Sequence, residues 1–181
     1  SIVIGGLNND DAGSDAGHAR VYSWNGATWA QKGADIDGEA AGDLFGISVD
    51  MNADGNTVAI GGYTNDDGGA SNNVGHVRVY SWDGSAWVQK GLDINGEAAN
   101  DWSGWQTRIS ADGDVVAIAS TRNSSSRGHV RVYVWNGTAW VQRGLDIDGE
   151  SSGDWSGYSL GLSADGETVA IGALFNTCLL Y

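Results

Sequence analysis

Short runs of apolar residues, broken by glycine next to asparagine or aspartate, follow one another along the whole chain. The runs are rich in Val, Ile, Tyr and Trp, which favour strands. Asn-Gly and Asp-Gly pairs between them favour tight hairpins, because glycine accepts a positive φ without steric cost. No stretch keeps a helical period over the length of a helix. The pattern therefore predicts an all-β protein.

The strand-like runs fall into four types, and each type occurs at least three times along the chain. In chain order the types occupy 44–51, 102–109 and 155–162; 57–61, 115–119 and 168–172; 18–24, 76–82 and 129–135; and 29–32, 87–90 and 140–143. In the third type both alternating faces carry apolar side chains, as in a strand that is covered on both sides.

The chain is one sequence unit written three times. The separation between each His that opens a third-type run and the Ile of the next second-type run is constant, while the following loop varies in length. Four short strands in about 55 residues fit one blade of a β-propeller. We therefore assign repeat units to 1–57, 58–115 and 116–168, with a surplus strand and an atypical tail in 169–181.

Two dipeptide positions point to a known repeat type. Phe45-Gly46 is an FG pair, and Ile60-Gly61-Gly62 stands where a GAP end is expected. At these residues the chain resembles the FG-GAP repeat family, the blade type of integrin-α-like propellers and of many bacterial secreted proteins. The resemblance implies propeller blades and an extracellular or cell-surface location. The chain departs from the family in the loop 52–55, which lacks the carboxylates of the D-x-D-x-D-G calcium motif.

Three blade equivalents are fewer than the roughly four to eight with which propellers close. The chain starts in a second-type run, 1–6, and ends after another copy of it, 168–173. Unpaired strand edges seek partners. We expect a homodimer of six blades, in which the run 155–162 of one chain completes the blade opened by 1–6 of the other and the surplus strand is displaced. A fragment of a longer repeat array is the alternative.

The chain is strongly acidic, with a net charge of −14 and nine Lys and Arg residues among 181. Nucleic acids and anionic lipid surfaces need clustered basic residues, so both are excluded as partners. No apolar run approaches the roughly 18 residues of a membrane span, and no membrane insertion is expected. The single cysteine, Cys178, excludes a disulfide framework and a cysteine-based zinc site.

An acidic turn follows the fourth-type run in each copy and is the metal candidate. Calcium takes about six to eight oxygen ligands, some of them from backbone and water. The alternative is a turn between blades whose acids cap backbone amides or pair with the repeat Arg. The side chains are Asp35, Asp37, Glu39 and Asp43; Asp93, Asn95, Glu97 and Asp101; and Asp146, Asp148, Glu150 and Asp154.

Aromatic residues of the first-type run are the ligand-binding candidate. Such rings near the inner edge of a blade could stack on a sugar or a peptide side chain, or could simply form inter-blade core. We add two charged residues to these ligand-binding candidates, because they occupy the same position of the first-type run in two copies but differ in charge. The six residues are Trp102, Trp105, Trp155, Tyr158, Asp50 and Arg108.

The loops of variable length are a third candidate, because recognition often lies on loops. Residues 8–11 with Asp15, and 65–67, offer carboxylates, whereas 123–127 offers none. Polar connecting loops are the alternative interpretation. The three His, at 18, 76 and 129, occupy the same place in every copy, which favours packing over one convergent metal site.

No nucleophile elbow, phosphate loop or Ser/His/Asp set is visible, and every candidate acid recurs three times. The sequence therefore favours a non-catalytic binding module for protein or glycan partners, with calcium as the one cofactor considered. The alternative is a purely structural repeat segment of a larger secreted, adhesin-like protein, with no ligand of its own.

Overall fold

A computed structural model describes residues 1–66 and 72–176 of the chain, and it confirms the all-β prediction. The strands form four antiparallel sheets in chain order. The sheets contain β1 (Ile2–Gly6), β2 (His18–Trp24), β3 (Trp29–Gln31) and β4 (Ile36–Asp37); β5 (Ser48–Met51), β6 (Thr57–Gly62), β7 (His76–Trp82), β8 (Trp87–Gln89) and β9 (Ile94–Asn95); β10 (Ser103–Ile109), β11 (Val115–Ser120), β12 (His129–Trp135), β13 (Trp140–Gln142) and β14 (Ile147–Asp148); and β15 (Ser156–Leu162) and β16 (Val169–Ala173). One short helical segment, α1 (Asn123–Ser126), follows β11.

The second and third sheets have the same strand order. It is β5-β6-β7-β8 with β9 on β7, and then β10-β11-β12-β13 with β14 on β12. The first sheet, β1-β2-β3 with β4 on β2, has no strand beside β1, and the last sheet contains β15 and β16. The second, third and last sheets therefore take their inner strands, β5, β10 and β15, from the repeat unit that precedes them.

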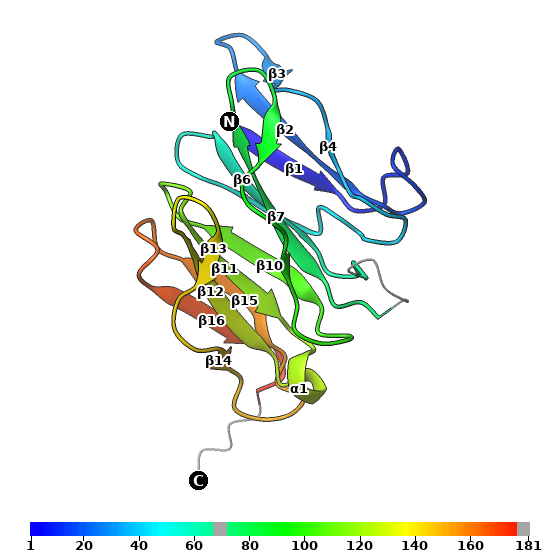
Figure 1. The fold of residues 1–181 in the computed structure, drawn as a ribbon, viewed down its shortest axis with the longest axis vertical. Coiled ribbons are helices and arrows are strands. Elements are labelled where there is room, and N and C mark those ends of the chain that lie inside the picture. The colour runs from blue at the N-terminus through cyan, green and yellow to red at the C-terminus, as the bar shows by residue number, and fades with distance from the viewer. Residues whose placement is uncertain (67–71, 177–181) are drawn as a thin grey trace.

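Neighbouring sheets pack through their inner strands. The strand β5 contacts β1 and β10, and β10 contacts β15. Figure 1 shows the resulting arrangement, with the blue N-terminal sheet at the top and the orange-red β15 and β16 at the lower left. The second and third sheets lie between them.

The second strand of each complete sheet forms the core. Every residue of β6 and β11 is buried. Val58 and Ile60 of β6 pack with Val21 and Phe45 from the neighbouring sheet and its connection. Burying a side chain of this size contributes about 1.5–3 kcal/mol. The equivalent strand of the first sheet is open, since Ile4 of β1 remains 51% exposed.

Two features differ from the predicted runs. Short strands form inside the acidic turns, where β4 pairs Ile36 with Ala19 at the start of β2. The first-type run of the second sheet is also shorter than predicted, because β5 begins at Ser48. Leu44 has a φ of 51° and Gly46 a φ of 96°, and an extended strand does not allow these values.

A tryptophan clamp joins the second sheet to the first and the third sheet to the second. In the second sheet Trp82 and Trp87 lie 5.4 Å apart between ring centroids, and Nζ of Lys32 from the first sheet lies 5.3 and 5.2 Å from them. The Trp87 indole N–H donates to the Lys32 carbonyl oxygen at 2.7 Å. The clamp recurs between the third sheet and the second, with Trp135, Trp140 and Lys90.

Candidate ligand-binding site

The aromatic side chains predicted near the inner edge lie together in one cluster. Trp102 and Trp105 stack with ring centroids 5.7 Å apart and 17° between their planes. Trp155 meets Trp102 edge-on at 6.4 Å, and Tyr158 lies 5.9 Å from Trp105. The cluster thus connects the starts of β10 and β15. It is only half-buried, and Tyr158 is 38% exposed.

Three members of the cluster were missed by sequence reasoning. Tyr63 lies 5.0 Å from Trp102, and Phe175 lies 5.6 Å from Trp155. Arg122 is the third, and its guanidinium carbon lies 3.7 Å from the centroid of the Trp102 ring. These three residues follow the strands β6, β11 and β16. A bulky side chain three or four residues after the Ile of each second-type run is therefore the sequence signal that could have identified them.

Arg122 occupies a special place for a basic residue in this acidic chain. Its guanidinium also lies 5.6 Å from the Trp155 ring, and its side chain is exposed. Within residues 1–66 and 72–176, it forms no ion pair with a carboxylate. A guanidinium held on aromatic faces with its N–H groups open can donate hydrogen bonds to a ligand.

A polar cavity of about 490 Å³ opens beside this guanidinium. Arg122 and the hydroxyl-bearing residues 124–126 line it together with Asn100 and Asp101. The cavity therefore offers hydroxyl, amide and guanidinium groups next to an aromatic surface, while Asp101 itself is buried. This combination suits a ligand with many hydroxyl groups and an apolar face.

Backbone strain concentrates at the same place. Six of the nine non-glycine residues with positive φ in the described chain belong to the cluster or the cavity, among them Trp102 at 58° and Trp155 at 54°. The others are Asn100, Ser124, Ser125 and Ser126. Each such residue costs on the order of 1 kcal/mol or more. Leu44, which corresponds to Trp102 and Trp155 in the first copy, also has a positive φ, 51°, so the conformation at this position belongs to the repeat and not to the aromatic cluster alone.

Asp50 and Arg108 lie outside the aromatic cluster. Asp50 accepts the backbone N–H of Ile109 at 2.9 Å, which ties β5 to β10. Arg108 donates to the carbonyl oxygen of Thr107 at 2.7 Å. Neither side chain has a ring contact with the cluster among the described residues.

The first acid of each acidic turn stays with its own sheet. Asp35 accepts hydrogen bonds from Arg20 at 2.6 and 2.8 Å and from Gln31 at 2.6 Å. The hydrogen bond from Arg20 holds the pKa of Asp35 below its ordinary value. The equivalent pairs are Gln89 with Asp93 at 2.6 Å and Gln142 with Asp146 at 2.7 Å.

The third acid of the turn crosses to the next sheet. Glu39 pairs with Arg78 and lies 3.9 Å from Nδ1 of His76. Arg78 also pairs with Asp93 at 2.9 Å, so one guanidinium neutralises carboxylates from two turns. The equivalent contacts of Glu97 are with Nδ1 of His129 at 4.0 Å and with Arg131 at 3.5 Å.

The fourth acid is buried and holds a loop of the next sheet. Asp101 is 3% exposed and accepts hydrogen bonds from the Ala98 N–H at 2.9 Å and from Nδ2 of Asn123 at 3.2 Å. Because Asn123 follows Arg122, this link fixes the segment that carries the guanidinium. The equivalent pairs are Asp43 with Asn65 and Asp154 with Asn176.

The remaining members of the turns face other partners. Asp148 pairs with Arg127 at 3.1 Å, Asp37 is exposed, and the carbonyl oxygen of Asn95 accepts a hydrogen bond from Arg131 at 2.8 Å. Glu150 accepts a hydrogen bond from Nδ2 of Asn176 at 3.2 Å.

The acids of one turn are therefore spread over several partners. The groups that do converge join one His with carboxylates of different segments, with ligand atoms within 4.8 Å: Asp11, His18 and Asp35; Glu39, His76 and Asp93; and Glu97, His129 and Asp146. Calcium prefers oxygen ligands, and Arg78 already supplies positive charge to the second group. The donor sets fit calcium poorly, and the calcium site stays a prediction.

The three variable loops form different structures. In the first, Nδ2 of Asn8 donates to Asp15 at 2.7 Å. In the second, Asn65 holds the buried Asp43, and Asp67 lies outside the described residues. The third loop lines the cavity beside Arg122. The described part of the second loop reaches the site as well, because the Trp102 N–H donates to the Asn73 carbonyl oxygen at 3.4 Å.

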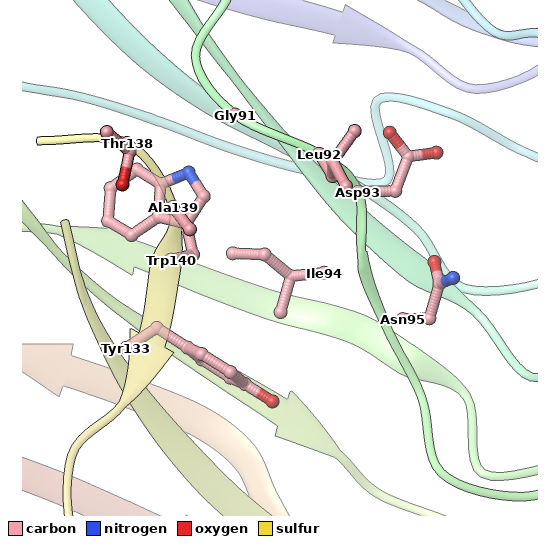
Figure 2. Close-up of a pocket in the computed structure, with 9 residues that line it drawn as sticks. All are labelled: Gly91, Leu92, Asp93, Ile94, Asn95, Tyr133, Thr138, Ala139 and Trp140. Carbon is pink, nitrogen blue, oxygen red and sulfur yellow. The ribbon is translucent and has the colours of Figure 1, made fainter. Parts of the chain in front are cut away.

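A second cavity, of about 460 Å³, lies at the outer rim between the second and third sheets. Figure 2 shows Leu92, Asp93 and Ile94 on one side of it, and Tyr133 and Trp140 on the other. A cavity of about 290 Å³ repeats it between the first and second sheets. Because the groove recurs at both boundaries, it follows from the way in which successive sheets pack.

No family model and no curated protein sequence matches this chain. Within the part of the chain that the structure describes, no helix has the length and apolar character needed to cross a membrane.

Proposed function

We propose that the chain is a non-catalytic binding module made of FG-GAP-like propeller blades, and that it binds a glycan. The glycan surface consists of Trp102, Trp105, Trp155, Tyr158 and Arg122 with the adjoining polar cavity. The repeated strand order of the second and third sheets and their packing through inner strands support the blade assignment. The resemblance supports an extracellular or cell-surface location.

One observation carries the proposal: a half-exposed aromatic cluster meets a polar cavity at a single guanidinium without a carboxylate partner in the described chain. A sugar ring has apolar C–H faces that pack on aromatic rings and hydroxyl groups that need hydrogen-bond partners. The surface offers aromatic rings and hydrogen-bonding groups side by side, because Arg122 contacts the Trp102 ring and also lines the polar cavity. Its location on residues that differ between repeats favours one site rather than three.

Calorimetric titration of the full chain with cello-, xylo- and uronate oligosaccharides tests the proposal. Saturable binding is expected with at least one of them, weakened about tenfold or more by Tyr158→Ala or Arg122→Ala. Val88→Ala is the matched control, because Val88 is 51% exposed on the outer strand β8. Absence of binding across the panel, or equal binding by all variants, contradicts the glycan site.

The second candidate is a purely structural repeat segment of a larger secreted protein. The tryptophan clamp favours it, because the clamp joins successive sheets whether or not a ligand is bound. A structural segment predicts no saturation with any sugar of the panel.

A further inference from the structure

The tryptophan clamp has an open half in the first sheet. Trp24 and Trp29 form the same ring pair as Trp82 and Trp87, with centroids 5.6 Å apart. No lysine or arginine lies over these rings within the described residues, and Trp24 is 53% and Trp29 49% exposed. In the other two sheets this pair is covered by the preceding sheet.

The complementary half is open in the third sheet, at Gly144. Gly91, its equivalent, has a φ of +83°, and a Cβ there would lie 2.7 Å from a ring carbon of Trp135. Gly144 has almost the same φ, +76°, but no atom lies within 4 Å of its Cβ position. It therefore has the backbone shape of a docked glycine without a docked partner.

The cation beside Gly144 is also held as it is in a formed clamp. Arg143 precedes Gly144 as Lys90 precedes Gly91, and it pairs with Glu167 at 3.0 Å. Lys90 pairs in the same way with Asp114, at 2.6 Å, while it lies over its two tryptophans. The Arg143 segment is thus arranged for docking before any partner arrives.

We propose that a second copy of this chain completes both halves, with Arg143 and Gly144 of each copy docked on Trp24 and Trp29 of the other. The two surfaces already recognise each other twice within the chain, at Lys32 and at Lys90. The docked Trp29 indole donates to the Arg143 carbonyl oxygen, and the guanidinium covers the rings. This self-association goes beyond the glycan proposal and docks through residues outside the proposed glycan surface, although it alters the contact between Phe175 and Trp155.

Docking also changes the partner of β15. The strand β1 pairs with β2 as β6 pairs with β7, so β1 is the second strand of its sheet. In the other copy, β16 is the second strand of the last sheet and pairs with β15. A first sheet docked there brings its β1 to the place that β16 occupies. One of the two must leave, and we assign this to β16. Asn9 of the incoming copy then replaces Asn176 on Asp154, because both follow the Ile of their run by five residues. Two such junctions close six sheets.

The test is the solution mass of the full chain by light scattering after size exclusion, with one glycine variant and its control. The expected mass is twice the 18.8 kDa of the chain. Gly144→Asn should reduce it to that of one chain, because asparagine tolerates a positive φ but its Cβ collides with the docked rings. Gly137→Asn should leave it unchanged, since Gly137 has a φ of +98° and an equally empty Cβ position at a hairpin tip.

A second variant checks the aromatic half. Trp24→Ala combined with Trp29→Ala should weaken association about tenfold or more. A single-chain mass for the unmodified protein, or a dimer that Gly144→Asn leaves intact, overturns the proposal. Sugar titration of the same samples separates this failure from failure of the glycan site, because sugar binding by a protein with the wrong mass overturns the self-association alone.

Discussion

Trp87 donates its indole N–H to the backbone carbonyl oxygen of Lys32 across a sheet boundary, and Trp140 does the same to Lys90, each at 2.7 Å. The acceptor is a backbone carbonyl oxygen, so it is present whichever side chain stands at position 32 or 90. The ring needs space instead, and Gly33 and Gly91 provide it. One sheet thus supplies a cation and a glycine, and the next supplies two rings.

Replacing Trp87 with Phe should lower the free energy of unfolding by about 1–2 kcal/mol. Phenylalanine keeps an aromatic ring at the boundary but leaves the Lys32 carbonyl oxygen without its donor, and an unpaired buried acceptor is costly. Urea denaturation of both proteins measures the difference. A loss well below about 0.5 kcal/mol would show that the hydrogen bond does not stabilise the boundary.

Gly91→Ala should destabilise the protein more than Gly137→Ala. Both glycines have a positive φ, so alanine is strained at either position. Only at Gly91 does the new Cβ also collide with a Trp135 ring carbon, which adds about 1–3 kcal/mol of overpacking. Thermal unfolding of the two variants gives the comparison. Equal destabilisation would contradict close ring packing at the boundary.

Asp101→Ala should cost about 1–3 kcal/mol, because it leaves the Ala98 N–H and the buried Asn123 amide without their acceptor. The same substitution should weaken sugar binding, since Asn123 positions the neighbouring Arg122. A double-mutant cycle with Asn123→Ala measures the coupling, which we expect to exceed about 0.5 kcal/mol. Additive effects would argue against a link between the turn and the loop.

Stability should fall as the pH drops below about 6.5, in part through His129. Burial lowers the pKa of His129 from its ordinary 6.5, Arg131 lowers it further, and Asp146, Glu97 and Asp101 oppose this. The unfolded chain therefore binds more protons than the folded one between the folded pKa and 6.5, and acid favours unfolding there.

Urea midpoints at about pH 7.5 and about pH 5.5 measure this dependence. His129→Gln should remove part of the loss, whatever its own effect on stability at the higher pH. An unchanged pH dependence in that variant would exclude His129 as a source.

Chelation should leave the melting temperature unchanged. The acids of each turn are engaged with Arg, Gln, Asn and backbone partners, and a bound ion that stabilised the fold would have to converge several of them. Melting curves with and without chelator, and after addition of calcium, provide the measurement. A drop in melting temperature on chelation would support the calcium site.

The strands could be predicted because their signals are local. The hairpins that join the first strand to the second and the third to the fourth contain an Asn-Gly or Asp-Gly pair, and the runs contain β-branched and aromatic residues. The short strand β4 could not, because Ile36 pairs with Ala19 from a segment that precedes a hairpin and a turn. A two-residue strand has no periodicity, and only the folded sheet defines it.

The site was predictable in part, for a similar reason. Trp102, Trp105, Trp155 and Tyr158 stood out because they replace smaller residues of the first copy. Arg122 did not, because its role depends on the 3.7 Å contact with Trp102 across two strands. The acidic turns are metal candidates because sequence proximity suggests convergence. The sequence does not predict that neighbouring acids of a turn contact different sheets, as Asp35 and Glu39 do.

The indole N–H resonances in a ¹H–¹⁵N spectrum test the central claim most directly. The chain has nine Trp, and six of them belong to the hairpin pairs at 24 and 29, 82 and 87, and 135 and 140. Titration with the best-binding oligosaccharide of the panel should shift the signals of Trp102, Trp105 and Trp155 and leave those six in place. Shifts confined to the hairpin pairs, or no shifts at all, would contradict a glycan site at the aromatic cluster.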